Sequence, residues 1–173
     1  MESTDVLVIG SGIAGLCAAI EAARTGATVT VASAGKTMSG SSFFPGTWGL
    51  GLIGPVDEDD EQDLIDTILA VGGGVADPEL VQTFVHGIPQ AIDWLEQDLG
   101  VELQRPQSAK SAQQKQFIPC FDHKTRMWRG LTRKPLEDAL TTWIESLGIR
   151  LLPRHELIDL VEDTNGRITG TVL

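Results

Sequence analysis

The feature that most constrains this chain is a glycine-rich turn close to its N-terminus. The turn has the spacing G-x-G-x-x-G and consists of Gly10, Ser11, Gly12, Ile13, Ala14 and Gly15. It follows residues 6–9, a short apolar run that is typical of a strand buried on both faces. Residues 13–24 are rich in Ala, Leu and Ile, which favour a helix, and Gly26 supplies its end. The β-branched segment 28–32 predicts a second strand.

Strand, tight turn, helix and strand together predict a βαβ unit, with a parallel strand pair and a right-handed crossover. Each glycine of the turn then has a physical reason. Gly10 permits the tight turn, Gly12 leaves room for a pyrophosphate, and Gly15 lets the helix pack closely on the strand. The helix N-terminus offers backbone N–H groups to negative charge. The sequence therefore predicts that this unit binds a dinucleotide.

The end of the second strand departs from the usual dinucleotide pattern. An acid is expected about 20 residues after the turn, where it holds the ribose hydroxyls. Ser33 stands there instead, followed by Ala34, Gly35 and Lys36. The Ser33 hydroxyl is able to bond a ribose without charge. The alternative is that a neutral pocket near Lys36 accommodates the 2′-phosphate of NADP.

Composition limits the classes of partner. The 173 residues are enough for one domain with its own core, and 13 basic against 24 acidic side chains give a formal charge of -11. That balance argues against nucleic acid or an anionic membrane as a partner. No apolar run is long enough to span a bilayer, the N-terminus is acidic, and the two cysteines match no metal or disulfide pattern. We expect a cytoplasmic protein with no metal site.

The middle of the chain alternates long loops with helices. Residues 33–55 are rich in Gly and Ser and are expected to form a functional loop. Residues 57–66 hold seven acids and no base, which predicts a solvated acidic face on a helix ending near Val71; a metal site is the alternative. Asp77, followed by proline, predicts the start of another helix. A further helix is expected over 89–98, and then a short strand over 101–103.

Residues 104–134 carry eight of the 13 bases and little periodicity. We interpret them as a basic surface loop; the alternatives are that its arginines face an anionic substrate or that His123 donates a proton. A helix is predicted from Pro135 to about residue 146, and a strand over 149–152. Two strand-like runs surrounding Asn165-Gly166 then predict a hairpin, whose apolar last strand needs a partner strand or belongs to a longer chain.

The chain resembles a known flavoprotein family. Residues 8–16 resemble the FAD fingerprint of the fumarate reductase/succinate dehydrogenase flavoproteins, which include L-aspartate oxidase. Residues 39–44 and 49–51 are similar to the family's Gly-Ser-Thr loop and the glycine pair beside the flavin, and residues 66–95 are similar to the helices that follow. The resemblance covers most of residues 5–103 and, more loosely, 135–173. The turn alone occurs in many nucleotide-binding enzymes; together with the Gly-Ser-Ser loop it is specific to this family.

The resemblance implies FAD as the cofactor. Binding would be noncovalent, because Ser41 stands where membrane-complex members carry the histidine that is linked to FAD. L-Aspartate oxidase-like members also carry a serine at the position of Ser33. The implied cofactor-binding residues are Gly10, Ser11, Gly12, Ile13, Ala14, Gly15, Ser33, Ala34, Lys36, Gly40, Ser41, Ser42, Gly49, Gly51 and Leu157.

The same resemblance divides these residues by role. The glycines of the turn would hold the pyrophosphate, and Ser33 the ribose region. Lys36 and residues 40–42 would line the phosphates and the flavin, and the backbone near Leu157 would meet the adenine. The glycines at 49 and 51 would let the isoalloxazine ring lie against the main chain.

The expected fold class is α/β: a Rossmann-like FAD-binding domain with a βαβ unit (1–36), a flavin loop, helices and basic loop (37–134), and a helix, strand and incomplete β-meander (135–173). The family's capping domain, substrate-binding residues and C-terminal flavin contact have no counterpart here, so no catalytic residue is implied. We expect the FAD-binding portion of an oxidoreductase acting on a small carboxylate. The alternative is a noncatalytic flavin- or NAD(P)-binding module that needs a partner chain.

Overall fold

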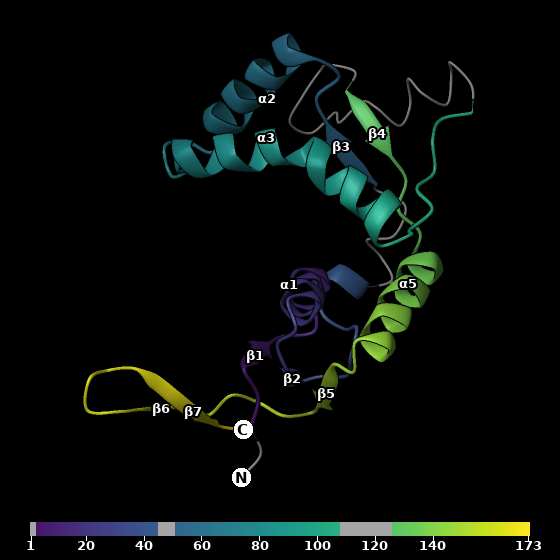
Figure 1. The fold of residues 1–173 in the computed structure, drawn as a ribbon. Helices are drawn as coiled ribbons and strands as arrows, with labels where there is room; N and C mark the ends of the chain where they lie inside the picture. The colour runs from purple at the N-terminus through teal and green to yellow at the C-terminus, as the bar shows by residue number, and fades with distance from the viewer. Residues whose placement is uncertain (1–2, 45–50, 108–125) are drawn as a thin grey trace. The chain divides into compact units, whose positions relative to one another are not determined.

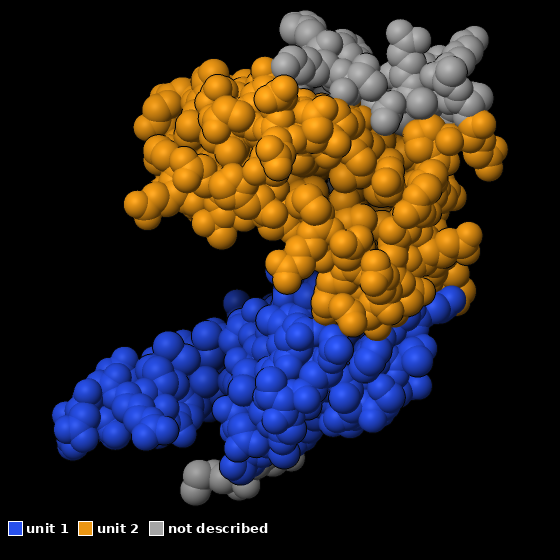
Figure 2. All heavy atoms as spheres, turned by 45° about the horizontal axis from the view of Figure 1, so that its top comes forward, with its two compact units in different colours: residues 1–48, 137–173 blue, residues 49–136 orange. Residues whose placement is uncertain are grey.

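The computed structural model describes residues 3–44, 51–107 and 126–173. The chain forms two compact units, shown in different colours in Figure 2. The first unit consists of residues 1–48 and 137–173, and the second of residues 49–136. Among the described residues, no helix is both long enough and apolar enough to cross a membrane.

A three-stranded parallel sheet forms the centre of the first unit (Figure 1). Its strands are β1 (Val6–Ile9), β2 (Val29–Ser33) and β5 (Arg150–Pro153), in the order β1-β2-β5. Helix α1 (Ile13–Arg24) connects β1 to β2, so the predicted βαβ unit is confirmed. β2 and β5 each begin and end one residue later than the sequence predicted. Because all three strands are parallel, their carboxyl ends lie along one edge of the sheet.

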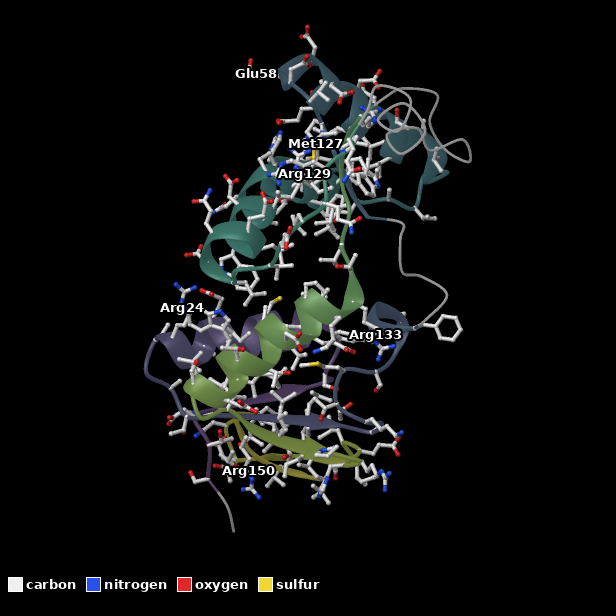
Figure 3. All side chains as sticks on the ribbon, turned by 90° about the vertical axis from the view of Figure 1, so that its right-hand side faces the viewer. Arg24, Glu58, Met127, Arg129, Arg133 and Arg150 are labelled. Carbon is white, nitrogen blue, oxygen red and sulfur yellow. The ribbon has the colours of Figure 1, made fainter. Side chains whose placement is uncertain are left out.

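Two helices cover one face of this sheet. They are α1 and α5 (Arg133–Ser146), whose residues from Glu137 onward belong to this unit. Figure 3 shows them on the same side of the strands, and the Arg24 guanidinium lies 5.4 Å from the centre of the Trp143 ring. The apolar residues buried here include Leu16, Ala19, Ile20 and Ala23 of α1, Val29, Val31 and Ala32 of β2, and Leu140 and Ile144 of α5.

A separate hairpin follows the sheet. It consists of β6 (Asp159–Glu162) and β7 (Ile168–Val172), which are antiparallel. The predicted turn is confirmed: Gly166 adopts a φ of 75°, and Oδ1 of Asp163 accepts hydrogen bonds from the backbone N–H groups of Asn165 (2.8 Å) and Arg167 (3.0 Å). Apolar side chains of both strands are exposed to solvent.

The second unit contains two short strands that the sequence did not predict. One is β3 (Leu52–Gly54), within the predicted loop 33–55, and the other is β4 (Met127–Arg129), within the predicted basic loop 104–134. The two strands pair antiparallel. Trp128 is only 3% exposed and packs on glycine backbone. A Cβ added to Gly51 would lie 2.5 Å from the Trp128 indole nitrogen, so this position excludes a larger residue.

This unit also contains two long helices, α2 (Glu58–Val71) and α3 (Pro78–Asp93). The predicted start of α3 at Asp77 is confirmed, and α2 begins directly after its N-cap Asp57. The Asp57 carboxylate accepts from the backbone N–H of Asp60 (2.9 Å), and the Asp77 carboxylate accepts from that of Glu79 (2.9 Å). The helices share an apolar core centred on Ile65, Val81 and Val85.

Two predictions for this region are wrong. No new helix starts at Pro89: α3 continues through it to Asp93, and a π-helical turn, η3 (Trp94–Asp98), follows. Proline removes one backbone hydrogen bond, but buried Val85, Ile88 and Ile92 keep the same face of the helix in the core. Residues 101–103 form no strand; backbone pairing begins at Gln104, which exchanges two 2.8 Å hydrogen bonds with Gly130.

The acidic start of α2 holds a buried ion pair, so the predicted solvated acidic face is wrong for Asp60. Arg126 is 1% exposed and Asp60 is 8% exposed, and Nη1 of Arg126 donates to the Asp60 carboxylate. Nη2 of Arg126 donates to Asp63 over 2.8 Å, and Oδ2 of Asp60 accepts from the Val56 backbone N–H over 2.9 Å. Each carboxylate oxygen of Asp60 therefore accepts a hydrogen bond from a group of the protein.

We predict that Arg126→Met destabilises the chain by about 3–5 kcal/mol, because it leaves the Asp60 carboxylate buried without its cation. Urea unfolding followed by circular dichroism measures this change. The matched control is Arg105→Met, which removes the exposed Arg105–Glu96 ion pair (2.7 Å) and is expected to change stability by less than about 1 kcal/mol. Equal effects of the two substitutions would contradict the assigned role of the buried pair.

Cys17 on α1 gives a second test of the packing. Partial burial, followed by the nearby Glu21 charge, raises the pKa of the Cys17 thiol to about 11. At pH 8 only roughly one thiol in a thousand is then ionised, and the thiolate is the reactive form. We predict that iodoacetamide labels Cys17 far more slowly in the folded chain than in urea, as measured by peptide mass spectrometry. Labelling at equal rates would show that α1 does not pack as described.

Candidate functional site

The glycine-rich turn joins the end of β1 to the start of α1. The Gly10 N–H donates to the Ala32 carbonyl over 2.7 Å, which continues the β1–β2 ladder by one residue. Gly10 then adopts a φ of +106°, which side-chain-bearing residues rarely adopt. Ser11 is buried, and its hydroxyl donates to the Lys36 carbonyl over 3.4 Å. The turn is thereby tied to the loop that follows β2.

Gly15 determines how closely α1 approaches β1. A Cβ at this position would lie 2.0 Å from the Gly10 carbonyl oxygen and 3.4 Å from Cγ1 of Val8. No side chain fits there, which is the close packing that the sequence motif predicted. Gly12 is the N-cap of α1 and has no side chain to cap it, and the first turn holds no acidic residue. The first turn of α1 therefore places no carboxylate beside the positive end of the helix dipole.

The turn forms one side of a groove of about 530 Å³ in the first unit. Three segments line it: the end of β1 with the turn, the end of β2 with the following loop, and the segment after β5. The lining residues are Ile9, Gly10, Ser11, Gly12, Ser33, Ala34, Gly35, Ser39, Gly40, Ser41, His155, Glu156 and Leu157. The groove thus lies at the carboxyl ends of the parallel strands, where ligands bind in open α/β sheets.

The third segment is held against the end of β2 by backbone hydrogen bonds. Ser33 and Pro153 are paired across β2 and β5. Arg154 then takes a φ of 61°, and its N–H donates to the Gly35 carbonyl over 2.9 Å. The His155 N–H donates to the Ser33 carbonyl, also over 2.9 Å. The chain therefore turns at Arg154 and carries the next residues to the loop after β2.

The structure brings together eight of the 15 residues named from the resemblance. They are Gly10, Ser11, Gly12, Ser33, Ala34, Gly40, Ser41 and Leu157. Ile13, Ala14 and Gly15 form the start of α1 next to the groove without lining it. Lys36 also does not line it and is exposed.

The remaining three residues lie elsewhere. Ser42 is in the short 3-10 turn η1 (Ser41–Phe43), directly after the lining residues. Gly49 lies outside the described residues. Gly51 belongs to the second unit, where its lack of a side chain accommodates Trp128.

Five lining residues were not named from the sequence: Ile9, Gly35, Ser39, His155 and Glu156. The first three are neighbours of named residues. His155 and Glu156 come from a segment more than 100 residues after the turn. The sequence nevertheless contains a pattern from which they can be expected at the groove. Residues directly after the third strand of a parallel sheet emerge at the same edge as those after the first two. The family resemblance implies only the Leu157 backbone there.

The lining is mostly neutral. Its titratable side chains are those of His155 and Glu156, and the remaining polar groups are backbone and serine hydroxyls. In the basic loop 104–134, Arg126 is paired with Asp60 and Arg105 with Glu96. Hydrogen bonds from Arg105 hold the pKa of Glu96 below its usual range. His123 lies outside the described residues. A neutral groove beside a helix N-terminus suits a ligand that is bound through main-chain N–H groups.

The family model for the FAD binding domain matches residues 5–173. The chain belongs to this family. The likeness to fumarate reductase and L-aspartate oxidase flavoproteins is confirmed by the relatives. The L-aspartate oxidase of Halobacterium salinarum is 35% identical over 99% of this chain and 32% of its own length. The vinyl phenol reductase of Lactiplantibacillus plantarum is 28% identical over 99% of this chain and 34% of its own.

Solved structures confirm the α/β fold class of the FAD-binding domain. An open conformation of a flavocytochrome c3 fumarate reductase aligns with a TM-score of 0.73 and 22% identity, over 98% of this chain and 30% of that one. The chain therefore spans about a third of the length of the proteins that it matches.

The groove of this FAD-binding domain fits part of an FAD molecule. Its volume lies within the range of about 300–1,000 Å³ that small-molecule sites occupy. Gly10 and Gly40 both have positive φ angles, and a Cβ added to either would meet nothing within 4 Å, so the backbone there is accessible. Serine hydroxyls and backbone groups supply the hydrogen bonds that phosphates and a ribose need.

We predict that Gly15→Ala disrupts FAD binding, because the new methyl group would collide with the Gly10 carbonyl and push α1 away from the turn. The change is measured as FAD affinity by fluorescence quenching, together with the urea midpoint. The matched control is Gly87→Ala in α3, where a Cβ meets nothing within 4 Å. That variant is expected to bind FAD normally and to gain up to about 1 kcal/mol of stability. Unchanged FAD affinity in Gly15→Ala would contradict the packing account.

Proposed function

We propose that the groove binds the adenosine diphosphate half of FAD noncovalently, and that the chain is the FAD-binding portion of a flavin-dependent oxidoreductase. One observation carries this proposal. The glycine-rich turn, the end of β2 and residues 155–157 line a single groove at the carboxyl edge of the sheet. This is where a dinucleotide binds in a doubly wound α/β fold.

The proposed roles follow the geometry of the groove. The pyrophosphate lies over the turn, where the backbone of Gly10 and Gly12 and the N-terminus of α1 favour negative charge. Ser33 and Ala34 meet the ribose, and the backbone of Leu157 meets the adenine. The side of the groove formed by residues 39–41 leads toward the flavin.

Four residues outside the lining complete the proposed cofactor contacts. Lys36 and Ser42 extend the phosphate and flavin side of the loop. Gly49 and Gly51 allow the isoalloxazine ring to lie against main chain. Bound FAD would supply the electron-accepting ring, while the protein supplies binding and orientation.

Noncovalent attachment is supported by the residue types near the flavin side. By the family resemblance, Ser41 corresponds to the histidine that is linked to FAD in the membrane-complex members. Residues 37–51 contain no histidine, cysteine or tyrosine that could form such a link.

We further propose a small carboxylate as the substrate of the complete enzyme. The support is the L-aspartate oxidase relative and an NADH:fumarate oxidoreductase of Klebsiella pneumoniae, 32% identical over 59% of this chain and 12% of its own length. The alternative is a noncatalytic flavin-binding module. Turnover separates the two: oxidation of aspartate or succinate, or reduction of fumarate, by the flavin-loaded protein supports the enzyme.

The hairpin suggests a partner for the first unit. Its exposed apolar side chains are Leu160, Val161, Ile168 and Val172, each between 45% and 48% exposed. We propose that a further strand, from a partner chain or a second copy, pairs with this hairpin. We also propose that residues 1–173 act as one FAD-binding domain. A reducing cytoplasm is the proposed location, since the cysteine pattern calls for no disulfide.

We predict that the purified chain binds FAD with micromolar affinity or tighter and then shows the visible absorption of a flavin. Titration of the colourless protein with FAD, followed by gel filtration, measures this. The flavin is expected to remain in the supernatant after acid precipitation, as noncovalent attachment requires. A protein that takes up no flavin would contradict the proposed function, and a yellow pellet would contradict the noncovalent attachment alone.

A further inference from the structure

The groove lacks a carboxylate at the position where dinucleotide-binding folds place one. In those folds an acid at the end of the second strand accepts a hydrogen bond from the ribose 2′-hydroxyl. Here the last residue of β2 is Ser33, and the groove residues that follow it, Ala34 and Gly35, have no polar side chain. From the end of β2 itself, the ribose would therefore meet one neutral hydroxyl.

Glu156 lines the same groove from the neighbouring strand. It follows three residues after Pro153, which is the pairing partner of Ser33 across β2 and β5. The left-handed turn at Arg154 and the 2.9 Å hydrogen bond from the His155 N–H to the Ser33 carbonyl return the chain to the end of β2. Glu156 therefore directly follows His155, whose main chain contacts Ser33.

His155 stabilises this arrangement through its side chain. Its Nδ1 lies 2.9 Å from the Pro153 carbonyl oxygen. A carbonyl only accepts hydrogen bonds, so Nδ1 is the donor, and in the neutral ring the proton is fixed on that atom. The imidazole ties residues 153 and 155 together across the left-handed turn. His155 is therefore a positioning residue for the segment that carries Glu156.

Glu156 is also available for a ligand. It is exposed, and among the described residues no ion pair involves it. It is the single acidic side chain among the 13 residues that line the groove. A carboxylate acts only as an acceptor, and ribose hydroxyls are donors, so the two groups match chemically.

We propose that Glu156 takes over the role of the missing β2 carboxylate and accepts a hydrogen bond from the 2′-hydroxyl of the FAD adenosine. The inference rests on the proposed function, because it concerns the same groove. It also gives the groove a selectivity: a carboxylate at this place repels a 2′-phosphate, which argues against the NADP alternative raised by Ser33 and Lys36.

The test pairs a side-chain deletion with a ligand deletion. The affinities of the wild-type chain and Glu156→Ala are measured for FAD and for an FAD analogue whose adenosine lacks the 2′-hydroxyl. We expect the wild type to bind the analogue roughly tenfold more weakly than FAD, as the loss of a hydrogen bond to a charged group implies. Glu156→Ala is expected to bind FAD roughly tenfold more weakly than the wild type does, and to bind FAD and the analogue equally.

The control is Glu162→Ala, which removes a carboxylate from β6, outside the groove lining, and is expected to behave as the wild type. If Glu156→Ala still prefers FAD tenfold over the analogue, another group binds the 2′-hydroxyl and the inference is overturned, while the proposed function stands. If the wild type binds neither ligand, the proposed function and the inference both fail.

Discussion

The close approach of α1 to the end of β1 is the contact on which the candidate site depends. It exists because Gly15 has no side chain where any Cβ would overlap the Gly10 carbonyl. With the helix seated there, the turn between them is fixed, and the helix N-terminus faces the carboxyl edge of the sheet. Phosphate binding at such a place needs no cationic side chain, because backbone N–H groups and the helix dipole supply the attraction. This accounts for a nearly neutral groove in an acidic protein.

The second unit is held together in a different way. Its strands are three residues long, and Trp128 packs against glycine backbone where a longer sheet would supply side chains. Its most demanding contact is the buried Arg126–Asp60 pair, which joins residues 66 positions apart. Because the buried Asp60 carboxylate would lose its cation without Arg126, the pair fixes the position of β4 relative to α2 as well as contributing energy.

Local signals allowed much of the fold to be predicted. The glycine spacing predicted the βαβ unit, Asp77 marked a helix start, and Asn165-Gly166 marked the hairpin. The missed features depend on contacts distant in sequence. No local pattern shows that Arg126 pairs with Asp60 or that Pro153 lies beside Ser33. The last contact also brings His155 and Glu156 into the groove lining, which the sequence did not predict.

The most direct test of this account is a crystal structure of the chain with FAD. We predict that the pyrophosphate lies over Gly10 and Gly12 at the N-terminus of α1, with the adenosine beside Ser33 and residues 155–157. A pyrophosphate bound away from this turn, or an adenosine on another face of the sheet, would contradict the account of the groove.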